Sequence, residues 1–301
     1  MPMTLTELRY VVAVAEARHF GQAAQRCFVS QPSLSASVKN LEEELGVKLF
    51  ERGKRGVLLT EAGEQIVAQA RRALEEAERV KTVARQGRDP LKGVLRLGII
   101  HTVAPYLLPD LVGALRRGAP GMPLDVEENT TATLDRMLKA GELDAVILAL
   151  PYDGPGIETV PLYEEVFRVV APAKHALARK KVIAVEDLDA GELLLLPVGH
   201  CFRDQVLDAC HEFSRAPDPG RQGNSLETLR SMVASGLGVT VLPATALTPR
   251  HANPLVKTIE FSAPRPVRRI ALASRRGFHR PAALDKLVAA IRELDLPVKR
   301  L

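Results

Sequence analysis

The sequence has few cysteines and no long apolar run, and both absences exclude classes of protein. Three cysteines among 301 residues are too few for the disulfide framework of a small secreted protein. Any pairing between them is therefore expected to be redox chemistry. No run of eighteen apolar residues occurs, and charges occupy the first thirty residues, where a signal peptide needs an apolar stretch. We expect a soluble, cytoplasmic protein without a membrane partner.

Motifs that bind cofactors are missing too. The chain has no Cys-x-x-Cys or His-x-x-x-His pair and no phosphate-binding loop, and Gly236-Leu-Gly238 is too fragmentary for a dinucleotide site. A metal site built from His200, Cys201, Cys210 and His211 is disfavoured, because adjacent residues do not easily aim at one ion. We therefore expect no cofactor and no metal.

Charge is only mildly informative. The net charge is +5 and the pI about 9.2, which permits a polyanionic partner without requiring one. Residues 1–90 hold 14 Lys and Arg against 12 Asp and Glu, a difference of +2. The placement of the charges must therefore carry any argument for DNA.

The chain is long enough for two or three domains, and its patterns change twice. Residues 1–59 are predicted to form short helices and a basic hairpin, 60–90 a long helix, and 91–301 two α/β lobes, divided at about 163–265 for the second lobe and 91–162 with 266–301 for the first. The nearly continuous apolar strands of the last segment are typical of parallel sheets covered on both faces.

The N-terminal segment contains a predicted helix-turn-helix. A capping-box pair, Thr4 and Glu7, starts the first helix, and Ser30 caps the helix that follows the turn at 28–30. That helix has Leu34, Val38 and Leu41 on its buried side. Its exposed side presents small polar or basic groups suited to a major groove: Gln31, Pro32, Ser33, Ser35 and Lys39. Without further support, two helices of an ordinary bundle would explain the pattern equally well.

A basic hairpin directly after this helix favours DNA binding. Glu51 to Thr60 contains three cations, Arg52, Lys54 and Arg55, and two glycines. Cations placed in this way contact phosphates, and their contribution weakens with salt. The alternative is a solvated surface loop.

The long helix carries small apolar residues at alternating spacings of three and four: Ile66, Ala70, Ala73, Ala77 and Val80. Such a stripe is typical of a dimerisation helix. Packing of that face on its own domain is the alternative.

Over its whole length the sequence resembles the LysR-type regulators. The resemblance is carried by Ser30-Gln-Pro-Ser-Leu-Ser35, Leu41-Glu-Glu-Glu-Leu-Gly46, Leu49-Phe-Glu-Arg52 and Leu59-Thr-Glu-Ala-Gly63. It implies a winged helix-turn-helix, a dimerising linker helix and a two-lobed effector domain resembling periplasmic binding proteins. It also implies a homodimer or homotetramer that acts on double-stranded promoter DNA, with RNA polymerase as a further partner.

Cys201 is a candidate reactive thiolate. It stands in the predicted first turn of a helix, where unpaired backbone N–H groups favour a thiolate, and Arg203 adds a nearby cation. Cys210 follows nine residues later. A continuous helix would separate the two by about 13 Å, whereas a disulfide needs Cα atoms within about 7 Å. If they pair, the helix must unwind. Cys27 is interpreted as a core residue.

A narrower resemblance is to the peroxide-sensing activators of the same family. It is carried by Gly199-His-Cys-Phe-Arg-Asp204 with Cys210, Asn224 to Arg230 and Gly238 to Pro243. It implies that hydrogen peroxide oxidises Cys201 and that Cys210 resolves the product to a disulfide, which induces antioxidant genes. It also implies a peroxide pocket made by Thr102, Thr131, His200, Arg203 and Asp204.

Two other interpretations remain. In the first, the regulator binds a small organic acid between its lobes and the cysteines are incidental. In the second, Cys201 belongs to a thiol peroxidase or hydrolase, but an enzyme would have little use for residues 1–60. We therefore expect a regulator and not an enzyme.

Overall fold

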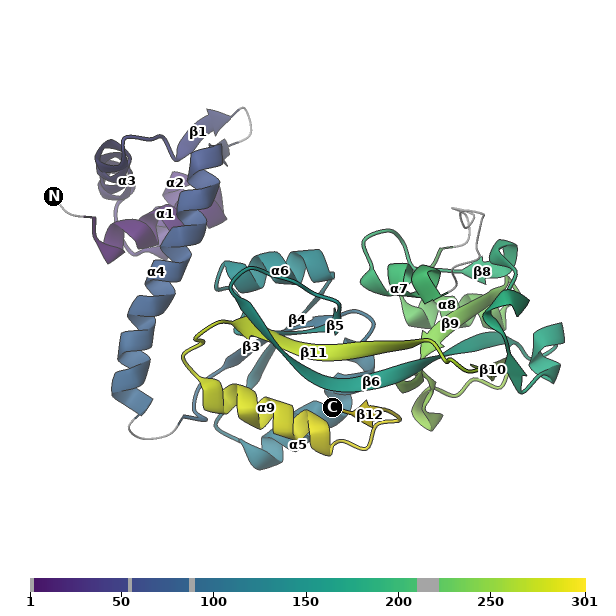
Figure 1. The fold of residues 1–301 in the computed structure, drawn as a ribbon. Helices are drawn as coiled ribbons and strands as arrows, with labels where there is room; N and C mark the ends of the chain where they lie inside the picture. Colours follow the sequence, from purple (N-terminus) through teal and green to yellow (C-terminus); the bar gives the residue numbers. More distant parts are fainter. Residues whose placement is uncertain (1–2, 54–55, 87–89, 210–221) are drawn as a thin grey trace. The chain divides into compact units, whose positions relative to one another are not determined.

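The computed structural model describes residues 3–53, 56–86, 90–209 and 222–301 (Figure 1). It divides into two compact units, Met1–Asp89 with Lys139–Glu142, and Pro90–Leu138 with Leu143–Leu301. We call these the N-terminal unit and the C-terminal unit. The finer domain and lobe limits expected from the sequence remain a proposal.

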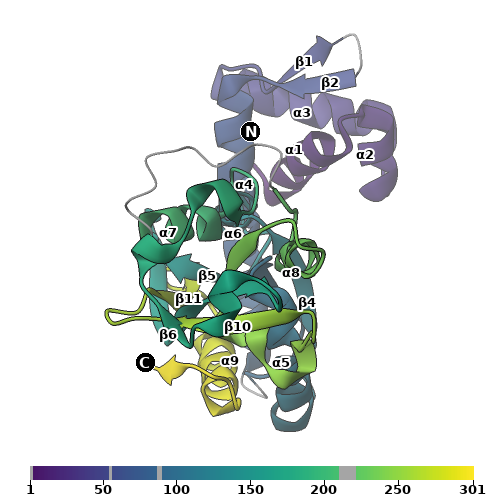
Figure 2. The same ribbon diagram turned by 90° about the vertical axis from the view of Figure 1, so that its right-hand side faces the viewer.

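The N-terminal unit is a winged helix-turn-helix. Its elements are α1 (Leu5–Ala17), α2 (Phe20–Arg26), α3 (Gln31–Leu45), the antiparallel pair β1 (Phe50–Gly53) and β2 (Gly56–Leu59), and α4 (Glu61–Gln86). Figure 2 shows β1 and β2 side by side. The predicted caps are confirmed: Thr4 and Glu7 form a capping box on α1, and the Ser30 hydroxyl accepts a hydrogen bond from the amide of Ser33 at the start of α3.

The core of this unit fixes how α3 is presented. Leu34 and Leu41 of α3 are fully buried together with Val11 of α1 and Leu49. Glu42 is also buried; its carboxylate accepts hydrogen bonds from the amides of Leu49 (2.8 Å) and Phe50 (3.3 Å) and from Lys48 Nζ (2.7 Å). Glu42 thus ties the end of α3 to the start of the wing. The opposite side of α3 is left to solvent.

The C-terminal unit is built on one mixed sheet. Its elements are β3 (Leu95–Ile100), α5 (Ala104–Gly118), β4 (Leu124–Asn129), α6 (Thr131–Lys139), β5 (Ala145–Leu150), β6 (Ile157–Pro172), β7 (Val182–Ile183), β8 (Leu193–Leu194), α7 (Cys201–Ala209), α8 (Leu226–Ala234), β9 (Val239–Pro243), β10 (Val256–Phe261), β11 (Val267–Arg275), α9 (Pro281–Glu293) and β12 (Lys299–Arg300), with short 3-10 turns between them. The main strand order is β4-β3-β5-β11-β6-β10-β7. Strand β3 is parallel to β4 and β5, whereas β6 is antiparallel to β9, β10 and β11.

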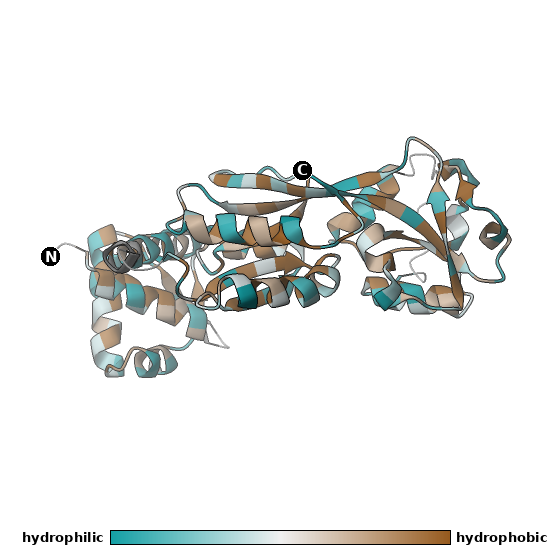
Figure 3. Cartoon of the chain, turned by 90° about the horizontal axis from the view of Figure 1, so that it is seen from below, coloured by the Kyte–Doolittle hydropathy of each residue, from teal (hydrophilic) through white to brown (hydrophobic). Residues whose placement is uncertain are grey.

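Two hydrophobic cores make this unit two-lobed. One core lies around β3, β5, α5 and α9, and the other around the second half of β6, β9, α7 and α8. The long strands β6 and β11 pair with each other, and β6 continues into the second lobe (Figure 1). The helices are banded brown and teal in Figure 3, as expected where one face covers the sheet and the other meets solvent.

Candidate functional site

Cys201 is the first residue of α7, as the sequence predicts. Gly199, two residues earlier, has φ +100°, a conformation that glycine adopts without strain and that lets the chain turn into the helix. The first amides of a helix have no partner within it, and the helix dipole favours negative charge there.

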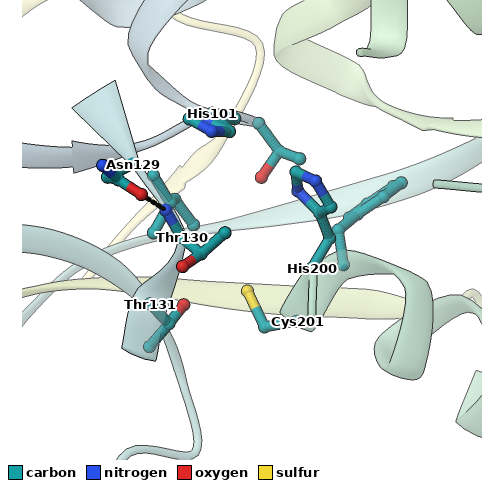
Figure 4. A pocket seen from close by; sticks show the side chains of 9 residues that line it. His101, Asn129, Thr130, Thr131, His200 and Cys201 are labelled. Atoms are coloured by element: carbon teal, nitrogen blue, oxygen red, sulfur yellow. Dashed lines mark hydrogen bonds between the residues drawn. The ribbon is translucent and has the colours of Figure 1, made fainter. Parts of the chain in front are cut away.

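The Cys201 side chain lines a very small cavity. It offers about 10 Å³ to the centre of a water-sized molecule, which is about the room that one water needs. The lining residues come from β3, β4, α6 and α7 and the turns beside them: Ile100, His101, Thr102, Asn129, Thr130, Thr131, His200, Cys201 and Phe202. Figure 4 shows the sulfur of Cys201 facing the hydroxyls of Thr130 and Thr131. The cavity thus fits a small polar molecule.

The threonines provide two kinds of hydroxyl. Thr131 Oγ1 is buried and has no hydrogen-bond partner among the described residues. Thr102, which is 3% exposed, accepts a hydrogen bond from Arg268 Nη1 at 2.8 Å, so its own proton is free to point elsewhere. Because a buried hydroxyl without a partner costs free energy, Thr131 is poised to bond a molecule in the cavity.

Two histidines lie on another side of the cavity. The rings of His101 and His200 are 5.4 Å apart between centroids. Burial, and secondarily the neighbouring His101, lower the pKa of His200, so His200 is neutral near pH 7. His101 Nδ1 lies 3.5 Å from a carboxylate oxygen of Glu128. A neutral imidazole can either accept or donate one hydrogen bond toward the cavity.

Beneath the cavity lies a buried ion pair that sequence reasoning missed. Arg268 and Glu165 have fully buried side chains and lie 2.7 Å apart, between Nη2 of the one and Oε1 of the other. Arg268 also donates to the hydroxyl and carbonyl of Thr102, and its guanidinium lies 4.9 Å from the centre of the Phe202 ring. Thr245 donates from its hydroxyl to Glu165 at 2.7 Å. Removing either charge would leave the other buried and unpaired, at a cost of about 3–5 kcal/mol.

The expected peroxide pocket included Arg203 and Asp204, and the structure corrects this expectation. Neither lines the cavity. Arg203 Nη1 donates to the carbonyl of Leu196 at 3.0 Å, and Asp204 is exposed. At 100° of rotation per residue, Arg203 lies on the side of α7 opposite Cys201, whereas Asp204 lies on nearly the same side, about one turn further along the helix. Arg203 instead joins the first turn of α7 to the segment before it.

Cys210 lies outside the described residues, and α7 ends at Ala209, next to it. Eight residues of helical rise separate Cys201 from Ala209 by about 12 Å, and one further residue can recover at most about 3.8 Å of that. The remaining separation, about 8 Å, exceeds the Cα distance that a disulfide accepts. A bond between Cys201 and Cys210 therefore requires part of α7 to unwind.

A wider cleft of about 630 Å³ lies elsewhere in the C-terminal unit. It is lined by Leu150, Pro151, Val185, Glu186, Gln205, Asp208, Ala209, Ser262, Ala263, Pro264, Arg265, Pro266 and Val267. Cys201 is not among these residues. The volume is in the range of small-molecule sites, so this cleft is the place for the organic acid of the alternative interpretation.

The helix-turn-helix presents the expected residues. Gln31, Pro32, Ser33, Ser35 and Lys39 are all exposed on α3. Lys39 pairs with Glu43 at 3.4 Å, and the hydroxyls of Ser30 and Ser33 are 2.8 Å apart. Arg52 belongs to β1. Lys54 and Arg55 lie outside the described residues.

The stripe expected to form a dimer is only partly free. Ala70 is 3% exposed in the core of the N-terminal unit, and Ile66 and Ala73 pack against the same core. The dimer interpretation is therefore wrong for Ala70, because α4 packs on α1 through this part of the stripe. Ala77 is partly buried, whereas Val80 is 71% exposed. Val80 is therefore the residue of the stripe that is exposed for contact with a partner helix.

Within the described residues, no group of three or more His, Cys, Asp or Glu side chains is arranged to hold a metal ion. The same residues include no helix with the length and apolarity needed to cross a bilayer.

Comparisons with known proteins match nearly the whole chain. Residues 5–64 match the model for bacterial regulatory helix-turn-helix proteins of the lysR family, and residues 88–295 match the LysR substrate binding domain. A probable hydrogen peroxide-inducible genes activator of Streptomyces viridosporus is 44% identical over 98% of this chain and 96% of its own. The DNA-binding transcriptional dual regulator OxyR of Escherichia coli K12 is 40% identical over 96% and 95%.

Solved structures agree. Full-length OxyR of Pseudomonas aeruginosa, with an aspartate in place of a cysteine, is 49% identical, has a TM-score of 0.86 and covers 98% of this chain and 96% of its own. A cysteine-to-serine variant of OxyR from Corynebacterium glutamicum with H2O2 bound is 34% identical, with a TM-score of 0.66 and coverage of 97% and 92%.

Proposed function

The chain belongs to the LysR family of bacterial helix-turn-helix regulators, and within that family we propose that it activates transcription of antioxidant genes when hydrogen peroxide oxidises Cys201. The observation that carries the proposal is the position of Cys201. Its sulfur opens α7 and faces threonine hydroxyls in a cavity sized for a very small polar molecule. The relatives named after hydrogen peroxide support it.

The chemistry needs only the two cysteines and peroxide. The Cys201 thiolate attacks one peroxide oxygen, the O–O bond breaks, and the leaving hydroxide takes a proton to become water. Cys201 is then a sulfenic acid. The Cys210 thiolate attacks the Cys201 sulfur, forming the disulfide and releasing a second water once the departing hydroxide is protonated.

The cavity residues have distinct roles in the first step. Thr131 and Thr102 orient peroxide through hydrogen bonds from their hydroxyls. Neutral His200 forms a further hydrogen bond with peroxide, as donor or acceptor. The unpartnered Thr131 hydroxyl gains a bond when peroxide enters. Such preorganised donors stabilise the charge that develops on the leaving oxygen. Arg203 and Asp204 are not assigned a contact with peroxide.

Disulfide formation reshapes the protein through α7. Phe202 and Val206 of this helix are buried at 2% and 1% exposure, and Phe202 packs edge-on to Phe167 at 5.2 Å and beside Arg268. Because the disulfide requires part of α7 to unwind, we expect the packing of this helix on the second core to change. Each fully buried apolar side chain contributes about 1.5–3 kcal/mol, so the oxidised form is a distinct packing of the second lobe.

DNA binding is assigned to α3 and the wing. The exposed face of α3 contacts base edges in the major groove, and Arg52, Lys54 and Arg55 contact phosphates. Val80, which α4 leaves exposed, contributes to a homodimer, and dimers pair into a homotetramer that acts in the cytoplasm with RNA polymerase. The protein acts as a regulator and not as an enzyme, because the oxidised cysteine pair is the signal itself.

One alternative is favoured by a specific observation: a metabolite-responsive regulator that uses the 630 Å³ cleft. It has room for an organic acid, whereas the Cys201 cavity does not. The names of the relatives favour the peroxide interpretation over this alternative.

The test compares Cys201→Ser with Cys27→Ser, which changes a cysteine packed against the core of the N-terminal unit. Transcription from a responsive promoter is measured in vitro before and after peroxide. We expect Cys201→Ser to bind DNA but to lose the response, and Cys27→Ser to keep it. Full peroxide induction in Cys201→Ser would refute the sensor assignment.

A further inference from the structure

The turn between α2 and α3 exposes a phenylalanine that the fold does not use. Phe28 is 95% exposed. The other described phenylalanines are buried or half-buried, as Phe20 and Phe50 are, which contact each other edge-on at 5.9 Å. A single exposed aromatic ring is not unusual by itself, but the backbone of Phe28 adds a second observation.

Phe28 occupies a position whose geometry favours glycine. Its φ is +56°, in the left-handed region. The amide of Phe28 donates to the carbonyl of Gln25 at 3.1 Å, and the amide of Val29 donates to Ala24 at 3.0 Å. This pair of bonds is the Schellman motif that ends α2, and its left-handed residue is usually glycine. A bulky residue there is an outlier. Neither packing nor local conformation therefore accounts for Phe28.

The place of Phe28 points to DNA as what covers it. Phe28 lies two residues before Ser30, which caps α3. In a helix-turn-helix, the N-terminal residues of the second helix contact base edges in the major groove. The turn that leads into α3 therefore lies at the edge of the groove. The exposed α3 residues nearest to it, Gln31, Pro32 and Ser33, are polar or small, so among the described residues of this turn and the start of α3 Phe28 is the large exposed apolar group.

We propose that the Phe28 ring contacts the 5-methyl group of a thymine when the protein binds its operator, and thereby favours thymine at one position of each half-site. The methyl group of thymine is the apolar group that base pairs present in the major groove, and phenylalanine is among the side chains that contact it. A backbone outlier at a binding surface is the kind of strain that a functional contact retains. This proposal rests on the proposed DNA-binding function.

The test uses the full-length reduced protein and a duplex selected from a random-sequence library by the wild-type chain. Phe28→Gly removes the ring and suits the backbone, so we expect a higher Tm together with about tenfold weaker binding, the size of one good base contact. Phe28→Leu keeps an apolar side chain and a non-glycine residue in the left-handed backbone conformation. We therefore expect it to bind DNA more tightly than Phe28→Gly.

Single deoxyuridine substitutions then locate the contact. At one thymine of each half-site, removing the methyl group weakens the wild type but leaves Phe28→Gly unchanged, whereas at other thymines the two losses add. Equal affinity of Phe28→Gly and the wild type would overturn the proposal. Losses that add at every thymine would overturn it too, as would a changed oligomer mass, which would place the ring in a subunit contact. Failure of the wild type to select any duplex would instead refute the proposed function.

Discussion

Replacing Thr131 by valine removes one hydroxyl from the cavity around Cys201 and nearly preserves the shape of the side chain. In the reduced protein this hydroxyl is buried and has no partner among the described residues. An unsatisfied buried polar group costs about 1–3 kcal/mol. The variant should therefore unfold with the same or a somewhat higher free energy than the wild type.

The reaction with peroxide should change in the opposite direction. A hydrogen bond to a group that gains charge contributes about 1.5–3 kcal/mol, which corresponds to about a tenfold to hundredfold slower oxidation of Cys201. The assay mixes reduced protein with excess hydrogen peroxide, quenches with an alkylating reagent at set times, and measures the unreacted Cys201 peptide by mass spectrometry. The rate constant is taken from its dependence on peroxide concentration.

Thr240→Val provides the matched control. The buried hydroxyl of Thr240 on β9 donates to the carbonyl of Leu194 at 2.8 Å, and Thr240 does not line the cavity. Its loss should leave the oxidation rate within about twofold and should lower stability by about 1 kcal/mol, the net contribution of one hydrogen bond. Oxidation of Thr131→Val at the wild-type rate would refute the role of this hydroxyl.

Three further predictions concern other parts of the chain. Glu42→Ala should lower the free energy of unfolding by about 1–3 kcal/mol and weaken DNA binding, because the amides of Leu49 and Phe50 lose their acceptor. Glu42→Gln keeps an oxygen at that place, so its effects should be smaller. Equal denaturant midpoints for Glu42→Ala and the wild type would contradict this prediction. The pKa of His200 is lowered from 6.5 by burial and then by His101, so the folded state disfavours its protonation: its contribution to stability is complete above pH about 6.5 and declines as the pH falls below that value. Chemical denaturation at pH 7.5 and 5.5 should show a smaller difference in His200→Asn than in the wild type, and an unchanged difference would argue against it. Arg52→Ala should weaken binding to all DNA sequences and reduce the slope of log affinity against log salt by about 1, which a salt titration of DNA binding measures; an identical slope would remove Arg52 from the phosphate contacts.

The N-terminal unit could be predicted closely because its signals are local. Caps at Thr4 and Ser30, the apolar spacing of Leu34, Val38 and Leu41, and glycines in the wing each depend on neighbours within a few residues. The long helix was predicted as well, but not the use of its stripe. Periodicity identifies an apolar face of a helix but not what packs against that face. Ala70 packs into the core of its own N-terminal unit.

The C-terminal unit was predicted less completely. Nearly continuous apolar runs were expected to mark the strands, but the first half of β6 and all of β10 mix apolar with charged or polar residues and carry no such run. Conversely, the apolar run from Leu193 to Leu196 forms a strand of only two residues, β8. Sequence patterns identify strands that are buried on both faces more readily than strands with one face exposed to solvent.

Prediction of the cavity had a similar limit. Cys201 at the start of a helix could be found from local sequence, and the resemblance identified Thr102, Thr131 and His200. Arg268 and Glu165 could not be paired, because they are 103 residues apart in the chain and only the pairing of β6 with β11 brings them together. Each stands in its strand beside a second residue of the same charge, Glu164 or Arg269, so nothing in the sequence marks it as the buried one.

The central claim is that Cys201 and Cys210 form a peroxide-driven disulfide. The most direct test treats the purified, reduced protein briefly with stoichiometric hydrogen peroxide, then measures the intact mass and maps the thiols by peptide analysis. The account predicts rapid loss of two hydrogens, with Cys201 and Cys210 in one cross-linked peptide pair and Cys27 still free. Thiols that stay unmodified would contradict it and would favour a regulator that binds a metabolite in the wider cleft.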